Sequence, residues 1–558
     1  MNASLIYYSV GAVLILIGIF VSSPALIATL RTIPPNLAEQ LLAGATLFRI
    51  GLVSLGIVLI VLGRAFIGKL ELQSRHPRSE SRPKIQIPTS LVIILFAALA
   101  LRLYKLNAGL WYDEILTYVH YARLPFGQII TTYGDQNQHF LYSILAHASF
   151  LIFGESGWSL RLPAVIFGTG SIWALYLFGR QVTNAREALL SAALLTFSYH
   201  HVWFSQNGRG YTALLFWTIL SSWLLLRGIR ETKPKLWVLY ALAVALGVYT
   251  HMTMLFVITA HFIIYLIEVL TRRKEMWPYR WSGFFLGFCL AGVLTLLLYA
   301  LVMPQLFGGT FWEGARLTII PWKNPFWTFV ELVNGIEIGF AAPVVGLLVF
   351  GGGLLSFGRK DPMVILLLIL PALVSAAVFI AMGHPLWPRT FFFTIGFGIL
   401  IIIRGGMLWG DLAAKLAHLG PTKSIPSGTV LCVGLILISA MSILSAYGPK
   451  QDYLGALTFV NERRGQRDAV VTVGIPATFP YRHFYKANWE AVETLQDLNS
   501  ARSRTGRTWL LYTMPLYVQS EYPEILVSIH RDFKVVQKFN GTLGGGTIFV
   551  CLSDLPPV

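Results

Sequence analysis

The stretch "RGIRETKPKLWVLYALAVALGVYTHMTMLFVITAHFIIYLIEVLTRRK", residues 227–274, holds two apolar runs between two basic clusters. Apolar runs of about 17–25 residues can cross a bilayer as helices. Lysine and arginine gather in the cytoplasmic loops of membrane proteins, so both clusters are expected on one side. The stretch therefore predicts two spans joined by a short outer loop around His251, although the first run, residues 236–249, is short for a span.

The composition extends this interpretation to the whole chain. The chain has 558 residues, of which 55% are hydrophobic and 12% are charged, and its mean hydropathy is +0.64. Soluble proteins carry about 25% charged residues, so the chain is predicted to be a polytopic α-helical membrane protein. The net charge of +17 falls in short clusters between apolar runs, which indicates membrane topology and not a nucleic-acid partner.

Further apolar runs along the chain resemble those two. We predict roughly thirteen spans in all. The basic clusters between them give a consistent orientation, with a cytoplasmic N-terminus and with the C-terminal segment outside. The predicted spans are residues 4–23, 48–66, 89–105, 160–178, 188–204, 211–226, 236–249, 254–270, 281–302, 343–357, 364–382, 389–403 and 429–446.

Three parts of the chain differ in character. Residues 1–88 hold two spans and a basic cytoplasmic loop, and the first span lacks the features of a cleaved signal peptide, so we expect it to be retained. Residues 89–446 form the predicted catalytic core, which includes an outer loop at residues 106–159. Beyond residue 447, helix and strand patterns alternate, which predicts a small α/β domain on the outer face. There, residues 452–465 and 489–504 read as helices, residues 468–474, 508–514, 533–539 and 546–552 read as strands, and the glycine-rich residues 541–547 read as a loop between strands.

The outer loop begins with "NAGLWYDEILTYVHYARLPF", residues 107–126, in which Asp113 and Glu114 are adjacent. Acidic side chains favour the first turn of a helix, so capping of a helix explains the pair as well as a catalytic role does. Ionisable side chains recur at the same end of other predicted spans, as a site built between helices requires. These are Asp135, His139, Arg209, His251, His384 and Arg389.

Each of these residues also has an ordinary structural explanation. Arginines at span ends reach lipid headgroups, and a histidine in an apolar run is more often an interfacial residue than a ligand. A divalent metal is an open alternative, because Asp113, Asp135 and His251 carry suitable atoms, but their spacing matches no metal motif. The acids at 313, 331 and 337 receive no role.

Five segments carry a family resemblance. "LWYDEILT", "NQHFLYSILAHASFLIFGESGWSLRLPAVIFGTGSIWALYLFGR", "WFSQNGRGYTALLFW", "YTHM" and "PRTFFF" stand in the order found in the GT-C integral-membrane glycosyltransferases. The likeness is to the branch of protein O-mannosyltransferases and lipid A aminoarabinose transferases (glycosyltransferase family 39), over about residues 91–404. The chain departs from that pattern at Phe140, where the family often has proline, and at Asn207, where many members have glutamate. The second departure puts in doubt a third acid or a metal ligand at that position.

The resemblance implies a function. It implies a hexosyl- or pentosyltransferase that uses a polyprenyl-phosphate sugar and transfers it to a lipid, glycan or protein acceptor on the outer face of the plasma (inner) membrane. Asp113 matches the position of the family's catalytic acid and is predicted to be the general base, with Glu114 beside it. Asp135 is predicted to orient the substrates. The side chains predicted to bind the donor and its phosphate are His139, Arg209, His251 and Arg389, with Lys105 and Arg161 as further candidates.

Two other functions stay open at this stage. A transporter or flippase of lipid-linked saccharides also carries charges in a polar cavity, but the chain shows no internal repeat and its acids cluster in one outer loop. A sugar polymerase or ligase that uses a diphosphate-linked donor fits the same fold. The sequence does not name the sugar or the acceptor.

Overall fold

The computed structural model describes residues 3–30, 32, 37–73, 88–231, 233–271, 281, 283–308, 341–382, 386–417, 427–504 and 507–553. Several residues discussed above lie outside these ranges. They are Glu313, Glu331, Glu337, His384, the basic residues at 272–274 and those at 75–84 in the basic loop of residues 1–88.

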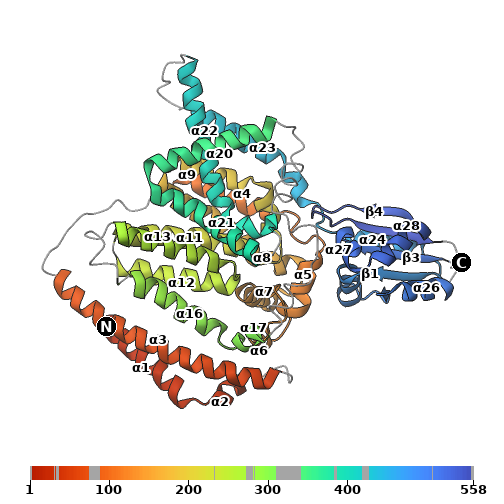
Figure 1. The fold of residues 1–558 in the computed structure, drawn as a ribbon, viewed down its shortest axis with the longest axis horizontal. Coiled ribbons are helices and arrows are strands. Elements are labelled where there is room, and N and C mark those ends of the chain that lie inside the picture. The colour runs from red at the N-terminus through yellow and green to blue at the C-terminus, as the bar shows by residue number, and fades with distance from the viewer. Residues whose placement is uncertain are drawn as a thin grey trace.

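The N-terminal part forms a helical hairpin at one edge of the molecule (Figure 1). Helix α1 (Ala3–Phe20) lies along α3 (Ala38–Gln73), and the short α2 (Ser23–Ala28) connects them. Arg49 on α3 donates to the carbonyl oxygens of Gly18 (3.0 Å) and Ile19 (2.9 Å). Carbonyl groups in the last turn of a helix have no partner within that helix, so Arg49 ties the end of α1 to α3.

The helical body is built mainly from long apolar helices. Over all the residues that the structure describes, the N-terminal hairpin and the outer loop included, seven helices are long and apolar enough to cross a membrane, and there are five shorter apolar helices. This confirms the prediction of a polytopic helical protein, while the number of thirteen spans stays a prediction. The body consists of α4 (Thr89–Leu103), α8 (Gly157–Val182), α9 (Ala185–Thr196), α10 (Tyr199–Ser205), α11 (Tyr211–Glu231), α12 (Pro234–Thr250), α13 (Met254–Thr271), η3 (Gly283–Cys289), α16 (Leu290–Tyr299), α20 (Ala341–Lys360), α21 (Pro362–Ala381), η5 (Pro388–Thr394), α22 (Ile395–Leu416), α23 (Ser427–Met441) and η6 (Ile443–Tyr447).

One predicted span, residues 188–204, is broken into α9 and α10. The Ser198 side chain caps α10 by accepting from the His201 backbone N–H, at 3.4 Å. Arg102, which is fully buried, donates to the carbonyl oxygens of Leu195 (3.5 Å) and Thr196 (3.4 Å) at the end of α9. A serine cap and a buried arginine thus stabilise a break that an apolar run does not reveal.

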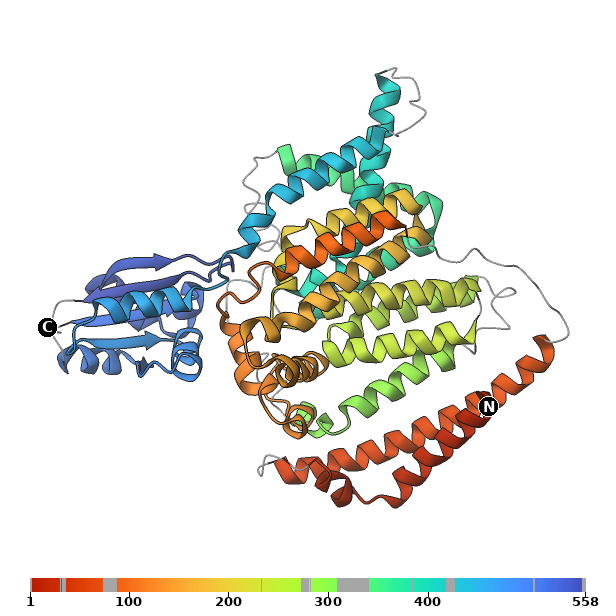
Figure 2. The same cartoon turned by 180° about the vertical axis from the view of Figure 1, so that it is seen from behind.

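The outer loop folds into short helices at the end of the body that faces the C-terminal sheet (Figures 1 and 2). It begins with α5 (Tyr112–Thr117) and the π-helical turn η2 (Tyr118–Ala122). Helices α6 (Phe126–Thr131) and α7 (Phe140–Phe153) follow. The same end of the body carries the turns between α10 and α11 and between α12 and α13, so segments distant in sequence meet there.

Residues 453–553 form a five-stranded sheet with helices, here called the sheet unit. Its strands are β1 (Ala469–Val473), β2 (Glu490–Val492), β3 (Thr508–Thr513), β4 (Lys534–Phe539) and β5 (Ile548–Ser553), in the order β2-β1-β3-β5-β4. Strand β1 pairs in parallel with β2 and β3, whereas β5 runs antiparallel to β3 and β4. The predicted strands are present, but residues 489–504 are not one helix, because 490–492 pair with β1 as β2 and α26 (Leu495–Arg504) starts only afterwards.

The two faces of the sheet have different neighbours. Helices α26 and α28 (Pro523–Asp532) cover one face, where Leu498, Ile525 and Leu510 share a core. Helix α24 (Tyr453–Arg463) covers the other face, and this second core continues into the outer loop through Ile115 and Tyr142. The sheet unit is therefore packed against the segment that carries Asp113.

The glycine-rich loop between β4 and β5 packs closely against residues 449–450, which precede the sheet unit. Trp203 on α10 donates to the Thr542 hydroxyl at 2.8 Å, and the Thr542 N–H donates to the Pro449 carbonyl, also at 2.8 Å. A Cβ on Gly541 would lie 2.1 Å from the Lys450 carbonyl oxygen, so only glycine fits there. The loop serves close packing between chain segments, which agrees with its interpretation as a loop between strands.

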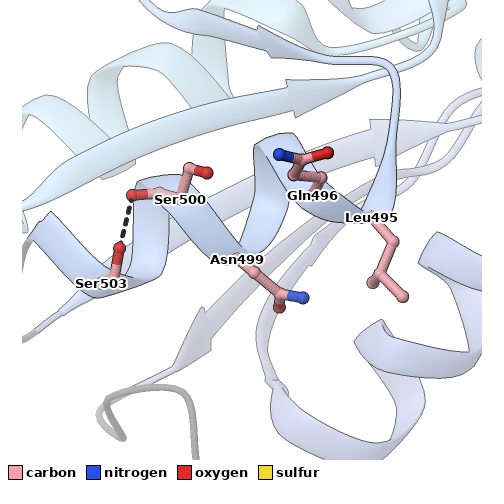
Figure 3. Close-up of a pocket in the computed structure, with 5 residues that line it drawn as sticks. All are labelled: Leu495, Gln496, Asn499, Ser500 and Ser503. Atoms are coloured by element: carbon pink, nitrogen blue, oxygen red, sulfur yellow. Dashed lines mark hydrogen bonds between the residues drawn. The ribbon is translucent and has the colours of Figure 1, made fainter.

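A shallow hollow lies on α26 (Figure 3), on the sheet face opposite the outer loop. Leu495, Gln496, Asn499, Ser500 and Ser503 line it, and the Ser503 hydroxyl donates to the Ser500 carbonyl at 3.0 Å. The hollow contains no titratable side chain, and it lies on a different element from every predicted site residue.

Candidate active site

Asp113 meets two arginines that come from distant parts of the chain. It lies in the first turn of α5 and is largely buried, with 8% of its surface exposed. Its Oδ2 is 3.3 Å from Arg389 Nη1 and 4.0 Å from Arg209 Nη1. Arg209 lies in the turn between α10 and α11, and Arg389 lies at the start of η5. The structure thus brings together three of the residues that the sequence singled out.

Arg209 has neighbours at its two terminal nitrogens, whereas its Nε has no hydrogen-bond partner among the described residues. Its Nη1 donates to the Asn137 side-chain oxygen, and its Nη2 is 3.5 Å from His139 Nε2. Its Nε is buried and has no hydrogen-bond partner in the part of the chain that the structure describes. This N–H is therefore an unsatisfied donor of the guanidinium that pairs with Asp113.

His139 and His251 lie side by side next to Arg209, with ring centroids 4.6 Å apart. The Gly210 backbone N–H donates to His139 Nδ1 at 2.9 Å, so in the neutral ring the proton is on Nε2. Burial and the charges of Arg209 and Arg389 lower the pKa of His251 to about 3. The same causes, together with His251, place the pKa of His139 well below its ordinary value. Both rings are therefore neutral at neutral pH, and the positive charge of the site comes from the arginines.

Glu114 faces away from Asp113 and is fully buried. Arg161 grips both carboxylate oxygens, with Nε 2.7 Å from Oε1 and Nη2 2.6 Å from Oε2. The Gly208 N–H donates to Oε1 at 2.6 Å, and the Trp111 N–H donates to Oε2 at 3.3 Å. Burial alone would raise the pKa of Glu114, but Arg161, Lys450 and the Gly208 N–H outweigh it and lower this pKa. Glu114 thereby fastens α5 to the turn that carries Arg209.

Arg161 pairs with Glu114 and not with Asp113. Its remaining N–H groups donate to the carbonyl oxygens of Leu106 (2.9 Å), Ala108 (2.7 Å) and Gly109 (2.9 Å). The segment that leads into α5 is therefore folded around a buried guanidinium. This arrangement differs from the expectation that Arg161 assists at a phosphate.

The other predicted residues have more ordinary surroundings. Asp135 Oδ1 accepts from the Tyr121 hydroxyl (2.9 Å) and the Asn137 N–H (2.7 Å), so it shapes the turn that presents Asn137 to Arg209. Lys105 is exposed, and its ammonium group lies over the Tyr104 ring. Within the described ranges, no group of three or more histidine, cysteine, aspartate or glutamate side chains is arranged to hold a metal ion.

The segment that carries His139, Arg209 and His251 matches a known protein family. Residues 138–299 match the model described as dolichyl-phosphate-mannose-protein mannosyltransferase. Over these residues the chain is therefore similar to the mannosyltransferases that this model describes. It is also 24% identical over 202 residues to YkcB of Bacillus subtilis (strain 168), which is named as a mannosyltransferase. That match spans 27% of the length of YkcB and 33% of this chain.

Solved structures show likeness over more of the chain at lower identity. ArnT from Cupriavidus metallidurans bound to undecaprenyl phosphate has 14% identity and a TM-score of 0.49, over 84% of this chain and 99% of that chain. The archaeal oligosaccharyltransferase AglB from Archaeoglobus fulgidus, in complex with an inhibitory peptide and a dolichol-phosphate, has 13% identity and a TM-score of 0.45. That likeness covers 83% of this chain and 74% of AglB.

Proposed function

We propose that the protein transfers a sugar from a polyprenyl-phosphate donor to an acceptor hydroxyl, with Asp113 as the general base. The observation that carries the proposal is the placement of Asp113 beside Arg389 and Arg209, at 3.3 Å and 4.0 Å. A proton acceptor and cationic donors for a phosphate are what such a transfer needs at adjacent points. The mannosyltransferase family match makes mannose the first sugar to test.

The proposed step is a displacement at the anomeric carbon of the sugar. The acceptor oxygen forms a bond to this carbon while its proton passes to an Asp113 carboxylate oxygen. The bond between the anomeric carbon and the phosphate oxygen breaks, and its electron pair leaves with the polyprenyl phosphate. In this step Asp113 takes up the proton whose removal makes the acceptor oxygen nucleophilic.

Negative charge grows on the leaving phosphate during this step. The donors that we assign to it are Arg389 Nη1, the unpaired Nε of Arg209 and the Nε2–H of His139. Fixed donors in a partly dry site stabilise developing charge without reorganisation. The two guanidinium groups thus bind the phosphate while they also flank the base.

Glu114 has a different role from Asp113 in this proposal. Its two oxygens are occupied by Arg161, Gly208 and Trp111, and its side chain is fully buried. A carboxylate in that environment cannot reach an acceptor. Glu114 instead positions Asp113 and Arg209 by joining α5 to the turn before α11.

The proposed orientation places the site and the sheet unit on the extracytoplasmic face of the plasma membrane, with roughly thirteen spans in the chain. Helices α8, α11 and α22 have their site-facing ends near Arg161, Arg209 and Arg389. Their opposite ends are basic, and cytoplasmic ends of spans are enriched in such residues. The basic residues at or directly after the ends of α8 and α11 are Arg180, Arg186, Arg227, Arg230, Lys233 and Lys235, and Lys415 lies at the end of α22.

The experiment that tests the function uses the purified protein in liposomes with radiolabelled polyprenyl-phosphate mannose and an extract of envelope lipids, glycans and proteins. We expect label to join an acceptor fraction as polyprenyl phosphate is released. Movement of intact donor across the bilayer without release would instead identify a flippase. No release with mannose, xylose or aminoarabinose donors would reject the proposed reaction.

Arg389→Met is expected to lower kcat/KM for polyprenyl-phosphate mannose by about 10²–10³-fold, as loss of one charge-stabilising donor typically does. The guanidinium is 41% exposed, and the buried Asp113 carboxylate keeps Arg209 as a cationic neighbour at 4.0 Å. We therefore expect the melting temperature to stay close to that of the wild type.

Arg463→Met, an exposed arginine of the sheet unit, is the matched control and should transfer at the wild-type rate. Equal kcat/KM in Arg389→Met and Arg463→Met would remove Arg389 from the phosphate-binding group.

A further inference from the structure

Two adjacent residues just before the sheet unit contact the two segments that carry Asp113 and Arg209. Lys450 and Gln451 follow η6 and precede α24, and both side chains are buried, with 6% and 1% of their surface exposed. No motif marks this "GPKQDY" segment in the sequence. Polar side chains buried this completely need partners, and their partners are informative here.

Gln451 holds the helix that carries Asp113. Its Oε1 accepts from the Tyr112 backbone N–H at 3.0 Å, and its Nε2 donates to the Thr513 hydroxyl at 3.2 Å. The first N–H groups of a helix have no partner inside the helix, so a glutamine from another segment satisfies the one next to Asp113. Because Thr513 ends β3, the central strand, Gln451 links α5 directly to the sheet unit.

Lys450 holds the segment that carries Arg209. Its ammonium donates to the Gln206 carbonyl at 2.7 Å and lies over the Trp203 ring, 4.9 Å from the centroid. Burial lowers the pKa of Lys450 to about 7, against the opposing effect of Glu114. The Lys450 carbonyl accepts from the Leu543 N–H at 3.2 Å, so the glycine-rich loop of the sheet unit holds the Lys450 backbone in place.

We propose that Lys450 and Gln451 are positioning residues, through which the sheet unit sets the distance between the base Asp113 and the arginine Arg209. This inference rests on the proposed function and extends it, because it gives the sheet unit a part in positioning the catalytic groups. Neither residue touches Asp113 or Arg209, so each acts through the backbone of its neighbour, Tyr112 or Gln206.

The test compares Gln451→Met and Lys450→Met, which keep an unbranched side chain of similar size and remove its hydrogen bonds. Displacement of a catalytic group by about 1 Å can cost 10²-fold in rate, so we expect kcat for polyprenyl-phosphate mannose transfer to fall by about 10–100-fold. The KM for this donor should stay within about twofold in Gln451→Met, because Gln451 contacts α5 and not the arginines. It should rise in Lys450→Met, because Lys450 holds the segment of Arg209, which also binds the phosphate. Lys450→Arg, which keeps a cationic donor, should recover part of the lost kcat.

A second readout does not depend on the reaction. Hydrogen exchange of the Tyr112 amide should accelerate in Gln451→Met, because its acceptor is gone. Gln537→Met and Lys534→Met on the exposed edge strand β4 are the matched controls, and neither should change exchange or kcat.

The outcomes separate the two proposals. Wild-type kcat in both Gln451→Met and Lys450→Met would overturn the positioning role and leave the transferase intact. Unchanged exchange at Tyr112 in Gln451→Met would also overturn it. If the wild-type protein transfers no sugar but the exchange accelerates as expected, the proposed function fails while the link from the sheet unit to α5 stands.

Discussion

Asp113→Asn is expected to lower the rate of sugar transfer by about 10²–10⁴-fold, the range that general-base catalysis contributes. Asparagine has nearly the same shape but cannot accept the acceptor's proton, so the reaction loses its base. It also removes the attraction to Arg389 and Arg209, which stand 3.3 Å and 4.0 Å away. The rate is measured as label joined to acceptor under saturating polyprenyl-phosphate mannose.

The matched control is Asp497→Asn, at the start of α26 in the sheet unit, where the carboxylate accepts hydrogen bonds from Thr494. That variant should transfer at the wild-type rate. Binding of the donor separates a chemical defect from a binding defect, and we expect Asp113→Asn to bind the donor at least as well, because the arginines lose a competing anion. If Asp113→Asn transfers sugar at the wild-type rate, Asp113 is not the general base.

Glu114→Gln is expected to destabilise the protein more than any exposed substitution. It leaves the Arg161 guanidinium, 2% exposed, without its counter-charge, and breaking a buried pair costs about 3–5 kcal/mol. The loss should appear as a lower melting temperature in detergent. Transfer should also fall, because Glu114 joins the segments that carry Asp113 and Arg209.

The chain offers a matched pair for comparison. Arg504 and Glu490 also lie 2.6 Å apart, but their side chains are 59% and 45% exposed. Exposed pairs contribute about 0–1 kcal/mol, so Glu490→Gln should leave the melting temperature almost unchanged. Equal melting temperatures for Glu114→Gln and Glu490→Gln would show that the buried pair of Glu114 and Arg161 does not stabilise the fold.

Much of the helical body could be predicted from the sequence, because apolar runs of span length fix where helices form. The break between α9 and α10 could not, since it depends on Ser198 and on Arg102 from another helix. Strand β2 was missed for a similar reason. Its three residues, 490–492, pair only with β1, and nothing within residues 489–504 marks that tertiary contact.

The candidate site was partly predictable. Ionisable residues at one end of several spans indicated that Asp113, Arg209 and Arg389 would meet, and they do. The sequence could not separate the roles of adjacent acids, because α5 turns one towards the arginines and buries the other against Arg161. Lys450 and Gln451 gave no signal at all, since their role depends on where the sheet unit packs.

The most direct test of the central claim counts both products of one reaction. The purified protein in liposomes receives polyprenyl-phosphate mannose with separate labels on the mannose and the lipid, together with envelope acceptors. We expect one polyprenyl phosphate released for each mannose joined to an acceptor, and both products to form about 10²–10⁴-fold more slowly in Asp113→Asn. Donor that crosses the bilayer intact, at the same rate in the wild type and in Asp113→Asn, would contradict it.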